Sequence, residues 1–117
     1  MSYFRDEEFK CSHCGVSKMD KAFIDKLNIL RESYGKPLRV TSGYRCPAHP
    51  VEAKKESSGA HTTGRAVDFA VQGADAHKLL SIALKMGFKG VGIQQKGTGR
   101  FIHLDDSDVN RPTIWSY

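Results

Sequence analysis

Two histidines and one aspartate have the residue types and spacing of a zinc site. His61 precedes Asp68 by seven positions in one segment, and His103 lies in a later strand-like run. Two imidazoles and one carboxylate give zinc three protein ligands and leave a fourth position open for water, as in catalytic rather than structural sites. If these three side chains meet in space, they predict a hydrolytic centre that uses one zinc ion.

A strand and the loop before it are expected to bring His61 and Asp68 together. Residues 65–71 form an apolar run flanked by glycines, and Asp68 lies in its middle. Gly64 gives the loop that carries His61 the backbone freedom to fold back toward this strand. A carboxylate inside an apolar strand must be paired or bound to a metal, which favours Asp68 as a ligand.

A second strand, expected at residues 100–104, carries His103. Because side chains alternate along a strand, Asp105 lies on the same face as His103, and Asp106 points the other way. Zinc lowers the pKa of its water and polarises a carbonyl oxygen, but a base must still accept the water proton. Asp105 is therefore the acidic candidate for this base.

Arg45 is the candidate for binding substrate. It follows an expected short strand at residues 38–41 and lies where the chain turns toward the loop that carries His61. A guanidinium at this place is suited to hold a substrate carboxylate or a carbonyl oxygen with paired hydrogen bonds.

The remaining elements predict an α+β fold in one domain, residues 1–117. A helix is expected from the capping residue Asp20 to position 34, and a second at residues 74–86. Residues 1–19 are expected to be irregular, with one helical turn near residues 51–56. Further strands are expected at residues 90–94 and, as an edge strand or a packed flap, in the tail at 113–117. Helices and strands mix without a β-α-β rhythm, which favours a small, mainly antiparallel sheet with helices packed on it.

Composition limits the possible partners without choosing among them. The 117 residues carry a formal net charge of +5, which suits an anionic partner, but the basic residues are scattered and no nucleic-acid-binding signature is present. No apolar run approaches the roughly 20 residues of a membrane span. The N-terminus has no apolar core of a secretory signal, so synthesis in a cytoplasm without a signal peptide is expected. Nothing in the sequence requires an oligomer, so a monomer is expected.

Three cysteines leave a second metal site open. Cys11 and Cys14 have the C-x-x-C spacing of a zinc knuckle or a redox pair, and Cys46 with either His13 or His49 would complete four ligands. The alternative is that these are small buried thiols without a metal.

Taken together, the segments resemble the zinc D-Ala-D-Ala carboxypeptidase family. The resemblance rests on Ser42-Gly43-Tyr44-Arg45, on His61-x-x-Gly64-x-Ala66-x-Asp68, and on Phe101-Ile102-His103-Leu104-Asp105, which occur in the family's order. That family includes phage cell-wall endopeptidases and shares its fold with the hedgehog signalling domain. The closing Trp115-Ser116-Tyr117 also resembles the family's C-terminal strand.

The resemblance implies roles for the candidate residues. His61, Asp68 and His103 would be the zinc ligands, and Arg45 would stabilise the developing oxyanion or the terminal carboxylate of the substrate. The substrate would be a peptide bond beside a D-amino acid in peptidoglycan stem peptides or cross-links. The expected protein is a phage or prophage product that acts on the cell wall after release or as part of a phage particle.

Two positions depart from the family pattern. Several branches carry an acidic base three positions before the last histidine, where this chain has Arg100. The compact phage-type branch, which the chain resembles, also lacks that acid. The usual serine two positions before the first histidine is replaced by Gly59. Two alternatives therefore stand beside the peptidase: a non-catalytic, zinc-containing module that binds peptidoglycan, and a basic nucleic-acid-binding protein with a Cys11/Cys14 knuckle.

Overall fold

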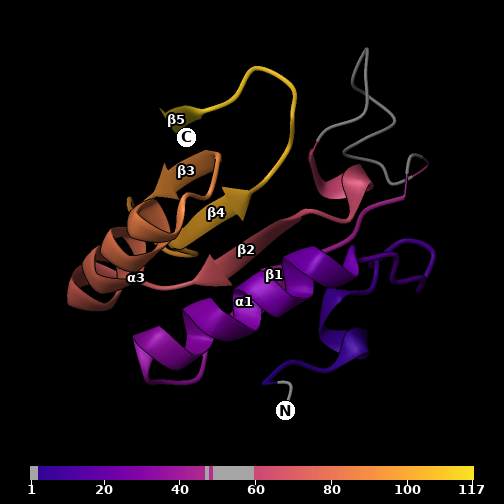
Figure 1. Ribbon diagram of the computed structural model, residues 1–117, viewed down its shortest axis with the longest axis horizontal. Helices are drawn as coiled ribbons and strands as arrows, with labels where there is room; N and C mark the ends of the chain where they lie inside the picture. The colour runs from indigo at the N-terminus through magenta and orange to yellow at the C-terminus, as the bar shows by residue number, and fades with distance from the viewer. Residues whose placement is uncertain (1–2, 47, 49–59) are drawn as a thin grey trace.

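A five-stranded sheet forms the centre of the computed structural model, which describes residues 3–46, 48 and 60–117. Its strand order is β1-β2-β4-β3-β5 (Figure 1). The strands are β1 Arg39–Ser42, β2 Ala66–Ala70, β3 Gly90–Gln94, β4 Phe101–Asp105 and β5 Thr113–Ser116. The first four are antiparallel to their neighbours, and β5 pairs with β3 in parallel. The predicted α+β class is confirmed.

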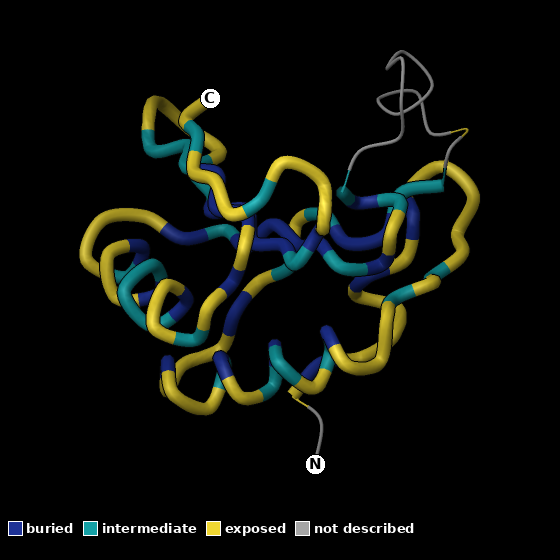
Figure 2. The backbone as a smooth tube through the Cα atoms, turned by 45° about the horizontal axis from the view of Figure 1, so that its top comes forward, coloured by how far each residue is buried: buried dark blue, intermediate teal, exposed yellow. Residues whose placement is uncertain are grey.

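Two helices, α1 (Lys21–Tyr34) and α3 (Gly73–Met86), pack against one face of the sheet. Buried residues are concentrated in the central strands and on the inner sides of these helices (Figure 2). The largest fully buried apolar side chains include Leu27 and Leu30 of α1, Leu79 of α3, and Phe69 and Ile102 of the sheet. None of the helices in the described part of the chain has the length and apolar character that a membrane span requires.

Both helices begin and end where the sequence predicts. The side chain of Asp20 accepts a hydrogen bond of 3.0 Å from the backbone N–H of Phe23 and so caps α1. Gly35 and Gly87 follow the helices in the left-handed conformation, both at φ 81°, which a glycine adopts without strain. The strands also match their predicted places to within a residue or two.

Alternation along β2 and β4 separates the core from the opposite face of the sheet. Val67 and Phe69 of β2 pack toward the helices, as do Ile102 and Leu104 of β4. Asp68 and His103 are consequently directed to the other face, as predicted. The face without helices therefore receives the polar side chains of both central strands.

One expectation is wrong, one is resolved between two alternatives, and one lies outside the described residues. The N-terminal segment, predicted to be irregular, contains a 3₁₀ helix, η1 (Asp6–Phe9), whose Phe9 is buried in the core. The tail forms a strand, the first of the two forms expected for it. The helical turn predicted at residues 51–56 lies outside the described residues.

Gly64 fixes the chain that enters β2 against the start of α1. Its φ is +75°, and a Cβ at this position would overlap the backbone carbonyl oxygen of Lys18. Its own carbonyl accepts a hydrogen bond of 2.9 Å from the N–H of Asp20, the capping residue of α1. The second 3₁₀ helix, η2 (Ala60–Thr63), which carries His61, ends at this anchor.

We expect Gly64→Ala to lower the free energy of unfolding by about 3 kcal/mol, because it combines left-handed backbone strain with steric overlap. Gly97→Ala is the matched control: its φ is +65°, but nothing lies within 4 Å of an added Cβ, so about 1 kcal/mol is expected. Urea denaturation of both variants measures the difference. Equal losses would show that the contact with Lys18 contributes nothing.

Candidate metal centre

One row of side chains crosses the open face of the sheet. The strand register places Asp68 of β2 opposite His103 of β4, His103 opposite Gly92 of β3, and Gly92 opposite Trp115 of β5. The Nδ1 atom of His103 lies 2.9 Å from Oδ1 of Asp68. Two of the three predicted ligands are therefore neighbours on rigid, hydrogen-bonded strands, which hold them with little freedom to move.

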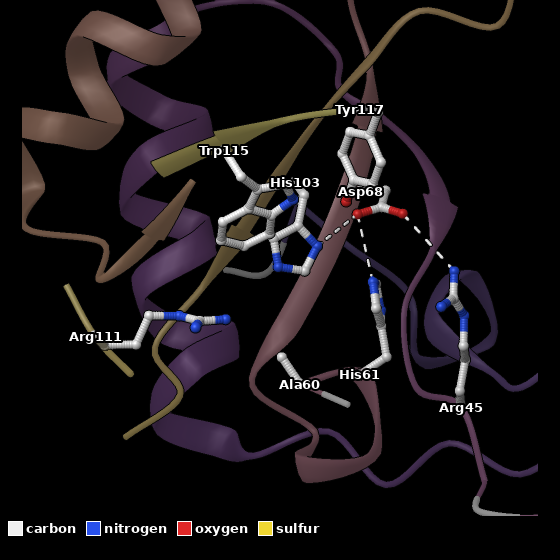
Figure 3. A pocket seen from close by; sticks show the side chains of 8 residues that line it. All are labelled: Arg45, Ala60, His61, Asp68, His103, Arg111, Trp115 and Tyr117. Carbon is white, nitrogen blue, oxygen red and sulfur yellow. Dashed lines mark hydrogen bonds and ion pairs between the residues drawn. The ribbon is translucent and has the colours of Figure 1, made fainter. Parts of the chain in front are cut away.

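His61 reaches the same point from η2. Its Nε2 lies 3.4 Å from Oδ1 of Asp68, and its ring centroid lies 5.0 Å from that of His103. One ligand atom from each of His61, Asp68 and His103 lies within 4.8 Å of the other two, and all three residues are buried. The structure thus brings together the three residues that the sequence predicts as zinc ligands (Figure 3).

Each imidazole is held by its outer nitrogen. Nδ1 of His61 lies 2.7 Å from the carbonyl oxygen of Gly43, and Nε2 of His103 lies 2.6 Å from Oδ2 of Asp105. When these nitrogens donate, the other nitrogen of each ring is left as the acceptor that faces Asp68. Histidines that bind a metal are commonly oriented in this way, by a carbonyl or a carboxylate behind the ring. The donor set and its outer partners therefore fit a zinc ion.

Asp105 lies behind His103 rather than in front of it. It is fully buried, and Arg111 binds both of its oxygens, with Nε 2.9 Å from Oδ1 and Nη2 2.8 Å from Oδ2. The N–H of Ser107 donates a further hydrogen bond to Oδ1. With His103, these contacts occupy both carboxylate oxygens. The predicted proximity of Asp105 to His103 is present, while its role as a base stays a prediction.

Small residues make room for this arrangement. Asp105 is opposite Ala66 on one side and Gly90 on the other, and a Cβ on Gly90 would overlap the Asp105 carboxylate. A Cβ on Gly92 would come within 2.6 Å of the Trp115 indole nitrogen. Without that Cβ, Trp115 leans across β3 until its ring centroid lies 5.0 Å from that of His103.

A pocket of about 500 Å³ opens in front of the three candidate ligands. In Figure 3, His61, Asp68 and His103 point toward one another, with Trp115 beside His103. The lining residues are Arg45, Ala60, His61, Asp68, His103, Arg111, Trp115 and Tyr117. The pocket therefore has a polar floor and a partly aromatic wall.

Arg45, the candidate for binding substrate, lines this pocket. Its Nη2 is 4.0 Å from Oδ2 of Asp68. The backbone N–H of Arg45 donates a hydrogen bond of 3.1 Å to the carbonyl oxygen of His61, so the loop after β1 and the helix η2 are tied together. Arg100, by contrast, lines a different pocket, with His77 of α3, and does not reach the metal centre.

Comparison with known proteins decides the family. Residues 2–105 match the Peptidase M15 family. The chain belongs to this family. The resemblance seen in the sequence is thereby confirmed, and the three-residue centre described above lies within the matched region.

Two relatives of this M15 chain carry the name Peptidoglycan L,D-endopeptidase MepK, one from Escherichia coli strain K12 and one from Shigella flexneri. Each is 29% identical to it over 117 residues. The match covers 88% of this chain and 63% of each relative, so the chain spans less than two thirds of the length of these curated relatives.

Sequence reasoning missed three residues of the site. Arg111, which holds Asp105, lies in a polar loop and carries no signal of its own. Trp115 and Tyr117 were expected only as part of the closing strand or flap and given no role in a site, but they line the pocket, and Tyr117 is more than half exposed. In the sequence, Trp115 and Tyr117 could have been found only as a pair of aromatic residues in an expected closing strand, next to an expected strand rich in glycine.

The buried carboxylates and imidazoles of the centre shift one another's pKa values. Burial alone would raise the pKa of Asp68, but hydrogen bonds and the charges of His103 and His61 outweigh it and bring the pKa well below its usual range. Burial is likewise outweighed at Asp105, where Arg111 and His103 lower the pKa. Burial alone would lower the pKa of His103, whereas hydrogen bonds to Asp105 and Asp68 raise it above the ordinary value.

These shifts predict how stability changes with pH in protein stripped of metal by a chelator. His103 has a raised pKa, so its contribution is complete below the unfolded value of about 6.5 and is lost as pH rises through the folded value. Asp68 and Asp105 have lowered pKa values, so their contributions are complete above about 3.9 and are lost as pH falls. Saturating zinc reverses the trend above pH 6.5, because zinc competes with the proton on His103.

Thermal unfolding of the wild type and of His103→Asn across this pH range, with and without zinc, tests the prediction. The comparison with the variant is needed because burial raises the pKa of the Cys11 thiol while backbone N–H groups outweigh it and lower that pKa to about 7, which gives the opposite trend. The wild type minus variant difference should decline as pH rises in chelator. A difference that stays level from pH 5 to 9 would contradict the assignment.

Proposed function

We propose that this chain is a zinc peptidase domain that hydrolyses peptide bonds beside D-amino acids in bacterial peptidoglycan. The observation that carries the proposal is the buried convergence of His61, Asp68 and His103 at the floor of an open pocket in a member of the Peptidase M15 family. Two imidazoles, one carboxylate and an accessible fourth position are the features of a catalytic zinc site.

His61, Asp68 and His103 would hold the zinc ion. A bound zinc ion supplies a Lewis acid that polarises the peptide carbonyl and lowers the pKa of water, so that hydroxide is available as the nucleophile near neutral pH. The remaining residues of the pocket bind and orient the substrate. Trp115 and Tyr117 form an aromatic wall along one side, which reduces the access of bulk water and provides apolar contact for the methyl groups of alanyl residues.

Arg45 would bind the substrate oxygen on which negative charge develops. Its guanidinium lies at the pocket rim near Asp68, and its backbone is tied to His61. A planar cation with several N–H donors stabilises a developing oxyanion or a substrate carboxylate through paired hydrogen bonds. Arg111, which also lines the pocket, is already engaged with Asp105 and with the carbonyls of Val109 and Asn110.

Asp105 would position His103. Its carboxylate accepts a hydrogen bond from the outer N–H of the imidazole and is held by Arg111, so Nδ1 of the ring would be free to bind the zinc ion. A carboxylate behind a histidine ligand also raises its basicity. These contacts favour positioning over the alternative role of general base, because Asp105 does not line the pocket in which the water and substrate would meet.

The relatives named MepK support peptidoglycan as the substrate and favour an internal bond over the terminal one. The net charge of +5 suits a polyanionic cell wall. We therefore propose an endopeptidase, with carboxypeptidase activity as the alternative. Action on the cell wall by a phage or prophage product, and a monomeric state, belong to the same proposal.

We expect the zinc-loaded protein to release peptides from purified sacculi, with mass spectrometry of the products identifying the bond cut. Chelator and His61→Ala should each abolish release. Arg45→Ala should lower kcat by about 100-fold if the guanidinium stabilises the oxyanion, whereas Arg45→Lys should recover part of the loss. Arg39→Ala, at an exposed arginine on β1, is the matched control and should leave the rate unchanged.

A folded, zinc-loaded protein that releases nothing from varied sacculi would contradict the peptidase. A second function would then hold: a zinc-containing module that binds peptidoglycan without cleaving it. One observation favours that function, since among the described residues that line the pocket the only carboxylate is Asp68, a predicted ligand. Retention of the protein on sacculi in a pull-down, without product, identifies this case.

Asp105→Asn separates the two roles considered for Asp105. Asparagine keeps an acceptor for the imidazole N–H, so a positioning role predicts zinc affinity lowered by about 10- to 100-fold and much of kcat recovered at saturating zinc. A general base predicts that kcat falls by about 100-fold or more at any zinc concentration and that the acidic limb of the pH–rate profile disappears. Zinc titration and the pH profile of kcat decide between them.

A further inference from the structure

The three cysteines, which the proposed function does not use, come together beside Arg45, where the chain that follows β1 meets the N-terminal segment. The sulfur atoms of Cys11 and Cys46 lie 3.7 Å apart, and the sulfurs of Cys11, Cys14 and Cys46 all lie within 4.8 Å of one another. This spacing is too long for a disulfide, whose sulfurs are about 2.05 Å apart. It is close to the spacing of sulfurs around one tetrahedral ion with bonds of about 2.3 Å.

A tight turn directs the first two thiols to the same side. The N–H of Gly15 donates to the carbonyl of Cys11 at 2.8 Å, and the N–H of Cys11 donates to the carbonyl of Val16 at 2.7 Å. Gly15 completes the turn at φ +72°. The C-x-x-C segment therefore forms a closed loop of the kind that presents two sulfurs to one metal ion.

Backbone N–H groups are aimed at the most buried of these sulfurs. The N–H of Cys46 lies 3.4 Å from Sγ of Cys11, and the N–H groups of His13 and Cys14 also hydrogen-bond it. N–H donors around a sulfur stabilise the thiolate, which is the form that binds metal. Cys11 is buried, yet the turn and the chain at Cys46 surround its sulfur with N–H donors rather than with apolar groups alone.

Backbone packing holds Cys46 beside this turn independently of the sulfurs. The N–H of Tyr44 donates to the carbonyl of Phe9 at 2.7 Å. At Gly43 the two segments are so close that a Cβ would come within 2.6 Å of the Cα of Phe9. The N-terminal segment and the chain after β1 thus lie side by side, and the three cysteines lie next to this contact, two on the first segment and one on the second.

We propose that Cys11, Cys14 and Cys46 bind a second zinc ion, separate from the His61 centre, that fastens the N-terminal segment to the loop carrying Arg45. Three thiolates with tetrahedral spacing select zinc or iron over calcium or magnesium. A fourth ligand from the chain or from water completes the coordination; His49, one of the two histidines considered from the sequence, lies outside the described residues. Because Cys46 follows Arg45 directly, this ion would also fix the rim of the pocket.

Metal analysis of the reduced protein provides the test. We expect two zinc ions per chain, and cobalt substitution should produce the near-ultraviolet charge-transfer band of thiolate bound to Co²⁺. Cys14→Ser, at an exposed cysteine, should remove one zinc ion and the band and lower Tm by about 5 °C. Ser12→Ala in the same turn is the matched control and should keep both ions.

Zinc binding at the cysteines and zinc binding at the His61 centre are lost in different variants, so this test can succeed or fail whether or not the proposed peptidase function is right. His61→Ala should remove the other zinc ion and leave the thiolate band. One zinc per chain with three thiols that react with Ellman's reagent before chelation would overturn the proposal. In protein prepared without reductant, the absence of two reactive thiols that reappear only on reduction would also overturn it, in favour of a Cys11–Cys46 disulfide. If Cys14→Ser does not fold, the stoichiometry and cobalt spectrum of the wild type decide.

Discussion

The pairing of Asp68 with His103 is the constraint on which the site depends. Both side chains are buried on adjacent strands, and a buried carboxylate is tolerated only with partners that offset its charge. The register of β2 with β4 makes them direct neighbours, and the alternation that sends Phe69 and Ile102 into the core sends Asp68 and His103 out of it. The same pattern that builds the core therefore builds the site.

Support for this pair extends outward in both directions. Behind His103, Asp105 and Arg111 hold the imidazole, and the absence of a side chain at Gly90 leaves space for the carboxylate. On the other side, the carbonyl of Gly43 orients His61 from the chain that follows β1. That chain is packed against the N-terminal segment, so a region outside the sheet contributes to the orientation of a candidate ligand. The candidate metal centre is thus integrated with the fold rather than added to its surface.

Much of this could be predicted from local sequence. Asp20 and Gly35 mark the ends of α1, and strict alternation places His103 on the face opposite the core, because caps and strand periods act over a few residues. The convergence of His61, Asp68 and His103 was anticipated from residue types and family resemblance together. The contacts of Trp115 were not, because they depend on β5 pairing in parallel with β3 across a glycine, which no local pattern encodes. Those of Arg111 were not either, because it lies in a polar loop that carries no signal of its role. The closeness of the three cysteines likewise depends on packing between distant segments.

The most direct test of the central claim is anomalous diffraction at the zinc edge from crystals of the zinc-loaded protein. The account predicts an ion bonded at about 2.0–2.2 Å to Nε2 of His61, Nδ1 of His103 and a carboxylate oxygen of Asp68. It also predicts that the hydrogen bond from His103 to Asp105 is retained. An ion bound through Nε2 of His103 with Asp105 displaced, or no ion among these three residues, would contradict the account.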